Sequence, residues 1–165
     1  MFLKFGEEVR VEDLIKGIAV VSGNDACVAL AENISGTEEV FVSKMNEKAK
    51  MLGLEGTQFQ NSHGMPVKDQ YTTALDMAIL ARRYVEAHPE ALSFHSTLSF
   101  EHNGILQGNR NVLLRRDIGV DGLITGHVEE SGYHLVVTAK RDGWGLIEVI
   151  MGSKSLSNRA REAQD

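Results

Sequence analysis

The sequence is poor in cysteine and proline, and it contains no long hydrophobic run. Cys27 is the only cysteine in 165 residues, which excludes an internal disulfide and a metal site made of cysteines alone. Its place in an apolar segment is typical of a small buried hydrophobe rather than of a catalytic thiol. The two prolines and the lack of low-complexity sequence argue against a long disordered linker.

The apolar runs are too short to span a bilayer. Residues 1–6 lack the hydrophobic region and cleavage site of a signal peptide, so we expect none in this chain. With 17 basic and 23 acidic side chains the net charge is −6, which argues against nucleic acid as a partner. The six histidines form no familiar ligand spacing, so we expect no metal and no other cofactor.

The first half of the chain has apolar residues at helical spacing, interrupted by glycines and capping residues. A first helix is predicted by the stripe Val11, Leu14, Ile15, Ile18 and Val21. It ends at Gly23, and Asn24 is the predicted N-cap of a second helix. The apolar residues of this second helix are Ala26, Cys27, Leu30 and Ile34.

Two further helices are predicted, with a loop between them. One begins near the capping-box pattern at residues 35–38 and ends at Gly53. Residues 54–71 are rich in turn-forming and polar residues and are predicted to form the loop. Thr72-Thr73 is predicted to cap the other helix. The predicted apolar face of that helix contains Leu75, Ala78 and Ile79.

After residue 96 the pattern changes to β-branched residues and hairpin turns. Short strands are expected on either side of Asn103-Gly104, and longer ones on either side of residues 141–143. The strands are predicted at 97–100, near 105, at 120–128, at 133–140 and at 146–151. The chain is therefore α+β, with a helical part at about 10–90 followed by antiparallel strands at about 97–152. Residues 156–165 resemble the first turns of another helix.

Three short motifs are weak evidence when each is taken alone. Ser22-Gly23-Asn24 has the residues that a tight junction between two helices needs. Thr125-Gly126 is an ordinary strand-to-turn feature, and His63 beside Gly64 is typical of a loop-bracing hydrogen bonder. Their order in the chain carries more information than any one of them.

Penicillin-recognising serine enzymes have Ser-x-x-Lys, then Ser-x-Asn, then Lys-Thr-Gly on a strand beside the site. Here Ser22-Gly23-Asn24 is followed far along the chain by a strand containing Ile124-Thr125-Gly126. The whole chain to about Arg161 resembles, in register, the low-molecular-mass penicillin-binding proteins, the D-alanyl-D-alanine carboxypeptidases. The resemblance is also carried by residues 1–4, 22–30, 52–54, 61–64, 70–71, 109–111, 120–127 and 132–133.

The resemblance implies a role for each matching residue. The serine matching Ser22 lies beside the reacting groups and helps to pass a proton to the leaving amine. The asparagine matching Asn24 holds the substrate's amide carbonyl and steadies the lysine of the first motif. Thr125 matches the hydroxyl that binds the terminal carboxylate, and Arg110 matches an arginine near the site.

Two more residues of the third motif have implied roles. The resemblance places the backbone N–H of His127 in half of an oxyanion hole, next to Gly126 in the substrate-binding strand. The other half would come from the nucleophile's own N–H. The implied fold is the transpeptidase fold of penicillin-binding proteins and β-lactamases.

The chain departs from the family pattern in two ways. No serine has a lysine three residues after it, so the 165 residues contain no Ser-x-x-Lys nucleophile. The third motif has Ile124 where lysine belongs, which removes a charged hydrogen bond of about 1.5–3 kcal/mol. We interpret residues 1–165 as a partial catalytic domain, truncated at both ends and inactive alone.

The resemblance implies peptidoglycan D-Ala-D-Ala peptides and β-lactams as ligands. It also implies a location in the periplasm or on the outer face of the cytoplasmic membrane. Alternatives are a pseudoenzyme that holds muropeptide without cutting it, a gene remnant, and a structural interaction domain. Because the sheet is expected to lack neighbouring strands, we also expect self-association through an unpaired edge.

Overall fold

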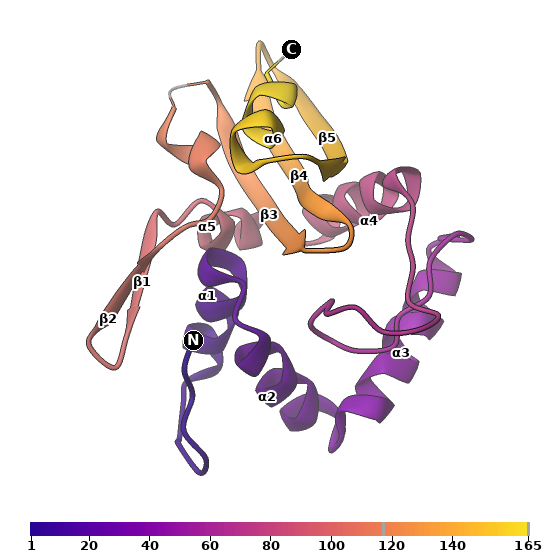
Figure 1. Cartoon of the computed structure of the whole chain (residues 1–165), viewed down its shortest axis with the longest axis vertical. Coiled ribbons are helices and arrows are strands. Elements are labelled where there is room, and N and C mark those ends of the chain that lie inside the picture. The colour runs from indigo at the N-terminus through magenta and orange to yellow at the C-terminus, as the bar shows by residue number, and fades with distance from the viewer. Residues whose placement is uncertain (117, 165) are drawn as a thin grey trace.

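The computed structural model describes residues 1–116 and 118–164 and has a helical body beside an antiparallel sheet (Figure 1). The helical body contains α1 (Val11–Val21), α2 (Asn24–Ser35) and α3 (Glu38–Met51). The other helices are α4 (Ala74–Ala87), η1 (Pro89–Ala91), α5 (Leu92–His95), η2 (Val112–Arg115) and α6 (Leu156–Glu162). The predicted helices are confirmed, and residues 54–71 form the expected loop, tied at its ends by the bridge Gln58↔Tyr71.

The main sheet has the order β3-β4-β5 and is antiparallel. Its strands are β3 (Val120–Val128), β4 (Gly132–Arg141) and β5 (Trp144–Ser153). A separate hairpin is formed by β1 (Ser99–His102) and β2 (Ile105–Gly108). Both predicted hairpin turns have positive φ at the two central residues, Asn103 with Gly104 and Asp142 with Gly143, as a tight two-residue turn requires.

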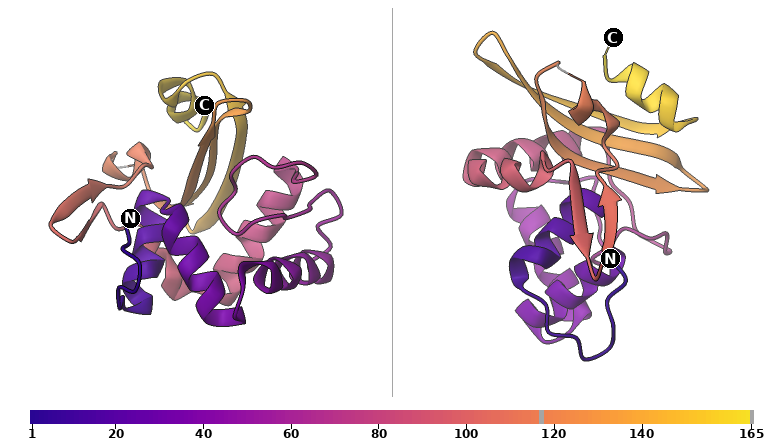
Figure 2. Two further views of the ribbon diagram at one scale, coloured as in Figure 1. Left: turned by 60° about the horizontal axis from the view of Figure 1, so that its bottom comes forward. Right: turned by 90° about the vertical axis from the view of Figure 1, so that its left-hand side faces the viewer.

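The main sheet is covered on its two faces by different helices (Figure 2). On one side Leu135 and Val137 of β4 pack with Leu113 of η2 and Ala160 of α6. On the other side Val136 packs with residues of α4 and α5. A third apolar cluster lies in the helical body, around Leu14, Val20, Val21 and Ala26. Because β4 alternates between two clusters, the consecutive residues at its centre, 135–138, are all buried.

The structure corrects the predicted start of α2. Its N-cap is Gly23, and Asn24 is the first helical residue. α1 ends at Ser22 in the left-handed conformation, and the Gly23 N–H donates to Gly17 O at 3.0 Å. Gly23 is therefore the extended residue between the helices. The Asp25 carboxylate accepts the Ala26 N–H at 2.9 Å, so a side chain inside the first turn satisfies one free donor.

The predicted apolar face of α4 is also corrected, because Leu75 is 70% exposed. Asp76 points inward instead and is 5% exposed. Its Oδ2 accepts from the Thr57 hydroxyl at 2.6 Å and from the Gly56 N–H at 2.8 Å. This polar contact fixes the rotation of α4, and successive residues about 100° apart then leave Leu75 in solvent. In the earlier helices Val11 and Ile34 are likewise 51% and 54% exposed.

We expect Asp76→Ala to lower the free energy of unfolding by about 2–3 kcal/mol, because the buried Thr57 hydroxyl and the partly buried Gly56 N–H lose their acceptor. Urea unfolding followed by circular dichroism measures this. Glu55→Ala, at an exposed position nearby, is the control and should change stability by no more than about 0.5 kcal/mol. Equal stability of the two variants would contradict the assignment.

Candidate functional site

The end of α1 meets β3 at Ser22. This residue has φ 54° and ψ 47°, and its N–H donates to Ile18 O at 3.1 Å. Its Oγ lies 3.5 Å from the carbonyl oxygen of Thr125, 103 positions further along the chain. The left-handed turn thus brings the Ser22 hydroxyl to the strand that carries the third motif.

Arg110 lies beside the same junction. Its Nε donates to Val21 O at 2.9 Å, and its backbone N–H donates to Val20 O at 3.3 Å. A guanidinium at the last carbonyls of α1 also complements the negative end of the helix dipole. Arg110 as a whole is exposed, and among the described residues its side chain makes no other hydrogen bond.

Arg159 of α6 binds the backbone carbonyl of Arg110 and so helps to hold Arg110 beside the end of α1. Its two terminal nitrogens donate to His134 O and to Arg110 O, both at 3.2 Å. The residue is only 4% exposed, and burial lowers the pKa of its guanidinium. Within the described residues it makes no ion pair, so main-chain carbonyls alone satisfy this buried cation. Sequence reasoning missed Arg159, because a single arginine in a polar tail gives no signal of burial.

The third-motif residues differ in burial. Ile124 is half-buried and packs against the apolar cluster that contains Ala81, Leu123 and Val136. Thr125 is half-buried, whereas Gly126 and His127 are exposed. The His127 ring lies against the Tyr133 ring across the β3–β4 ladder, with centroids 4.1 Å apart.

Of the predicted site residues, Ser22, Arg110 and Thr125 are thus brought together, and His127 follows on the same strand. Asn24 is exposed, and its side chain makes no hydrogen bond to the described part of the chain.

Buried asparagines hold the segment that leads from the small hairpin to β3. The Asn109 amide donates to His95 O and Thr97 O at 3.0 and 2.9 Å. Asn111 is 2% exposed, and its amide donates to Gly122 O at 3.4 Å. Both flank Arg110, so their side-chain bonds fix the backbone on either side of that residue.

Ser131 and His134 resemble a nucleophile and its base but do not have the required proton arrangement. Ser131 Oγ lies 2.9 Å from His134 Nε2. The Gly152 N–H donates to His134 Nδ1 at 3.2 Å, so Nδ1 carries a lone pair. Burial is the main cause that lowers the pKa of His134, so the ring is neutral and Nε2 carries the proton. The imidazole therefore donates to Ser131 and cannot accept its proton.

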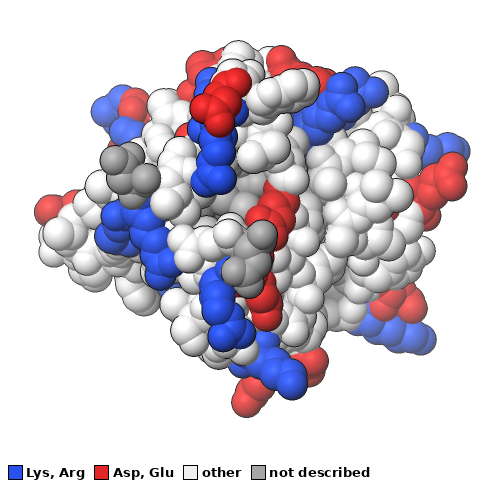
Figure 3. All heavy atoms as spheres, turned by 90° about the horizontal axis from the view of Figure 1, so that it is seen from above, with Lys and Arg blue, Asp and Glu red and all other residues white. Residues whose placement is uncertain are grey.

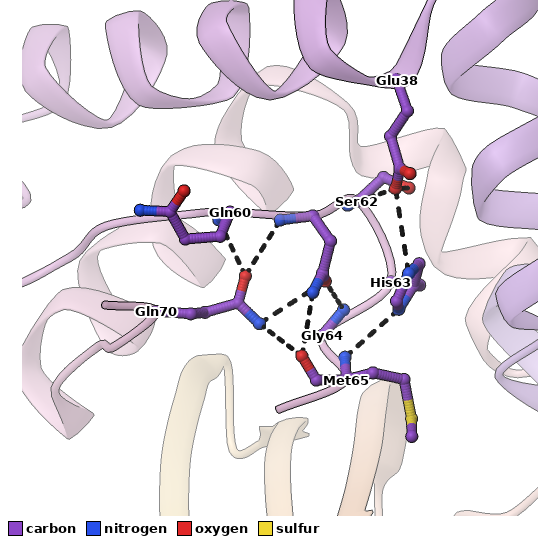
Figure 4. A network of polar contacts seen from close by, with 8 residues as sticks. Glu38, Gln60, Ser62, His63, Gly64, Met65 and Gln70 are labelled. Carbon is purple, nitrogen blue, oxygen red and sulfur yellow. Dashed lines mark hydrogen bonds and ion pairs between the residues drawn. The ribbon is translucent and has the colours of Figure 1, made fainter. Parts of the chain in front are cut away.

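The loop at residues 60–70 is braced by side-chain amides (Figure 4). Gln70 Oε1 accepts the N–H groups of Gln60 and Asn61 at 2.9 and 3.1 Å. The amides of Gln70 and Asn61 both donate to Met65 O, at 3.0 and 2.9 Å. Asn61 Oδ1 also accepts the Gly64 N–H at 2.7 Å. The loop is thus held by its own hydrogen bonds rather than by an apolar core.

The same loop is anchored to α3 through Glu38. Glu38 Oε1 accepts from the Ser62 hydroxyl at 2.6 Å and from the Ser62 N–H at 2.9 Å, with His63 Nε2 at 3.9 Å. These donors, first the hydroxyl and then the N–H, lower the pKa of Glu38. His63 Nδ1 accepts the Met65 N–H at 3.2 Å. A carboxylate that accepts several hydrogen bonds is a weak base. We therefore interpret the cluster of Glu38, Ser62 and His63 as structural.

Among residues 1–116 and 118–164, no group of three or more His, Cys, Asp and Glu side chains is placed to hold a metal ion. On the face drawn in Figure 3, basic and acidic side chains are interspersed beside a broad uncharged area. Nor does any helix in these described ranges have the length and apolar character needed to cross a membrane.

A family model described as D-alanyl-D-alanine carboxypeptidase (Peptidase S11) matches residues 1–155. The curated D-alanyl-D-alanine carboxypeptidase DacC of Escherichia coli (strain K12) is 43% identical over 165 residues, which cover 99% of this chain and 41% of the relative. The chain therefore spans less than half the length of this relative.

Solved structures agree with this match. Penicillin-binding protein 5 from Haemophilus influenzae has a TM-score of 0.96 at 43% identity, with 99% of this chain and 48% of that chain covered. Penicillin-Binding Protein D2 from Listeria monocytogenes, solved in its cefotaxime-bound form, has a TM-score of 0.86 at 29% identity, with coverages of 94% and 64%. The expected penicillin-binding-protein fold is thereby confirmed.

We expect Ser62→Ala to raise the pKa of Glu38 part of the way toward its ordinary value of 4.5, because the hydroxyl is lost and the backbone donor stays. The stabilisation by ionised Glu38 is present above 4.5 and is lost as the pH falls through the lowered pKa, so the variant should lose it at a higher pH. Carboxyl ¹³C titration by NMR measures the pKa. Ser43→Ala on the same helix is the control, and an unmoved Glu38 titration in Ser62→Ala would refute the assignment.

Proposed function

The chain belongs to the D-alanyl-D-alanine carboxypeptidase family, and on that premise we propose that it is the part of a serine-type carboxypeptidase carrying the second and third motifs. The substrates would be the D-Ala-D-Ala ends of peptidoglycan stem peptides, cleaved through an acyl-enzyme. The observation that carries this proposal is the 3.5 Å approach of Ser22 Oγ to Thr125 O, because it joins two motifs that lie far apart in the sequence.

Each site residue has one task in this proposal. Ser22 passes a proton to the leaving amine, and Asn24 holds the amide carbonyl of the substrate. Thr125 and Arg110 bind the terminal carboxylate, next to Gly126. The His127 N–H is one donor of the oxyanion hole. The contacts of Arg110 with Val21 O and Arg159 support its part, because they leave the guanidinium exposed but fixed at its base.

The acyl-enzyme step needs a Ser-x-x-Lys serine, which the 165 residues do not contain. In serine hydrolases the loss of the nucleophile costs on the order of a millionfold in kcat. We therefore expect this chain alone not to turn over substrate, and we assign residues 1–165 to one partial catalytic domain.

A second candidate function is non-catalytic binding of muropeptide, and the packing of Ile124 supports it. The side chain at the lysine position of the motif packs against the apolar cluster of Ala81, Leu123 and Val136 and carries no charge. Ser22, Thr125 and Arg110 remain available to a peptide, but the carboxylate loses its ammonium partner. This candidate predicts saturable but weak binding of a D-Ala-D-Ala peptide.

The cellular location and the further ligands that we propose are supported by the relatives. They are bacterial carboxypeptidases, and for a role on peptidoglycan we propose the periplasm or the outer face of the cytoplasmic membrane as the location. The cefotaxime-bound relative supports β-lactams as further ligands. Self-association is proposed through β5, which pairs only with β4 in the described sheet and exposes Trp144 and Leu146.

Restoring the charge of the third motif tests the proposed site. We expect Ile124→Lys to tighten the binding of a D-Ala-D-Ala peptide about tenfold to a hundredfold, the equivalent of one charged hydrogen bond. Isothermal titration calorimetry measures the affinity, and Thr125→Val should weaken it. Ile124→Met, of similar length but uncharged, is the control and should bind like the unchanged chain.

Equal affinity of the lysine and methionine variants would refute this carboxylate site, and turnover by the unchanged chain would refute the assignment of the nucleophile.

The proposed edge contact predicts concentration-dependent association in analytical ultracentrifugation. Leu146→Lys should weaken it, because a charge on an edge strand opposes pairing. Leu106→Lys places the same charge at a position that is 67% exposed on the other hairpin and should not affect association. A monomer at all concentrations would contradict the proposed contact.

A further inference from the structure

A half-buried histidine lies against β3 and has no part in the proposed chemistry. His95 is the last residue of α5, and its Nδ1 lies 3.0 Å from Leu123 O. A carbonyl oxygen only accepts, so Nδ1 must carry a proton. On the other side of the ring, Tyr84 Oη lies 2.9 Å from Nε2. In the neutral ring Nε2 then has a lone pair, and the Tyr84 hydroxyl donates to it. The two contacts select one tautomer of His95.

The partner of His95 is the residue directly before the altered motif. Leu123 precedes Ile124 and Thr125 on β3, and β3 pairs only with β4 within residues 1–116 and 118–164. In an antiparallel strand the N–H and C=O of one residue point to the same side, and successive residues point to opposite sides, so every second residue points the same way. Since Leu123 O is bound by His95, the carbonyl of Thr125 is expected on the same open side, where Ser22 Oγ lies 3.5 Å from it.

Two residues further on, the His127 N–H falls on this open side by the same alternation. It is the N–H that the proposed function assigns to the oxyanion. His95 and Ser22 therefore act on β3 as a neighbouring strand would, binding carbonyls on its unpaired side, and the next polar group is left for a ligand.

We propose that His95, oriented by Tyr84, is a positioning residue that fixes the third-motif strand through the carbonyl of Leu123. His95 also lies close to the backbone of the strand, since a Cβ built on Gly122 would lie 3.4 Å from the Cβ of His95. What the strand binds rests on the proposed function. The role of His95 in fixing the strand does not depend on the proposed function.

Burial favours the neutral ring of His95, whereas the hydrogen bond to Leu123 O favours the protonated one. His95 makes no ion pair among the described residues, and burial lowers its pKa. On α4, the Tyr84 hydroxyl has its pKa raised by burial and then by Glu90 of η1, and the His88 ring lies 6.0 Å from the Tyr84 ring. Because the pKa of His95 is lowered in the fold, its neutral form is fully stabilising above the ordinary value of 6.5. That contribution is lost as the pH falls through the lowered pKa.

The test combines ring tautomer and amide exchange in the 165-residue chain. Long-range ¹H–¹⁵N spectra at neutral pH should show His95 with protonated Nδ1 and bare Nε2. His95→Leu should raise the exchange rates of the β3 amides paired with β4 about tenfold, the effect of one lost hydrogen bond, while α2 and α3 keep theirs. His95→Asn keeps a donor near the Nδ1 position and should stay within about threefold of the unchanged chain.

His88→Asn, on a side chain that is 60% exposed, is the matched control and should leave β3 exchange unchanged. If His95→Leu does not fold, Tyr84→Phe keeps the volume and should give a mixture of His95 tautomers with faster β3 exchange. Protonated Nε2 in the unchanged chain, unaltered β3 exchange in His95→Leu, or failure of His95→Asn to restore protection would each overturn the proposal. No ligand enters these measurements, so a failure of peptide binding would count against the proposed function alone.

Discussion

The candidate site depends on arginine side chains that bind main-chain carbonyls. Buried Arg159 donates to the carbonyls of His134 and Arg110, and Arg110 donates to the carbonyl of Val21 at the end of α1. This chain of contacts runs from α6 and β4 to the end of α1, and it adds to the apolar packing that already holds α6 against the sheet. A charged donor to a carbonyl is stronger than a neutral one, and its fixed fork sets direction as well as distance. The placement of Ser22 beside Thr125 follows from this connection.

The third-motif strand shows how a site can retain its geometry while its charge changes. Ile124 contributes to the apolar contact between the sheet and α4, and Thr125 keeps its place opposite Ser22. Packing and hydrogen bonding of the backbone are independent of the ammonium that the family motif supplies. An altered motif can therefore persist in an ordinary fold, because the stability of the strand comes from β4 and the helices around it.

Much of the fold could be predicted because it follows local rules. The hairpin turns, the capping threonine of α4 and the strand β3 were all visible in the sequence, since each depends on a few adjacent residues. The errors came from tertiary contacts. Asp76 turns α4 by binding the loop before it, and no local pattern indicates that a carboxylate is buried. In the site, motif order identified Ser22 and Thr125, whereas His95 and Arg159 act through carbonyls that have no side-chain signature.

The loop at residues 60–70 has one further consequence, for its behaviour toward proteases. Much of it is exposed, and surface loops are ordinarily the first sites of nicking. A protease must draw out an extended stretch of backbone, yet here Gln70 and Asn61 hold that backbone in a closed turn. Cleavage would have to break several bonds together before any peptide reached the enzyme. Because residues 60–70 are exposed but their backbone is held closed, we expect this segment to be one of the more digestion-resistant parts of the surface.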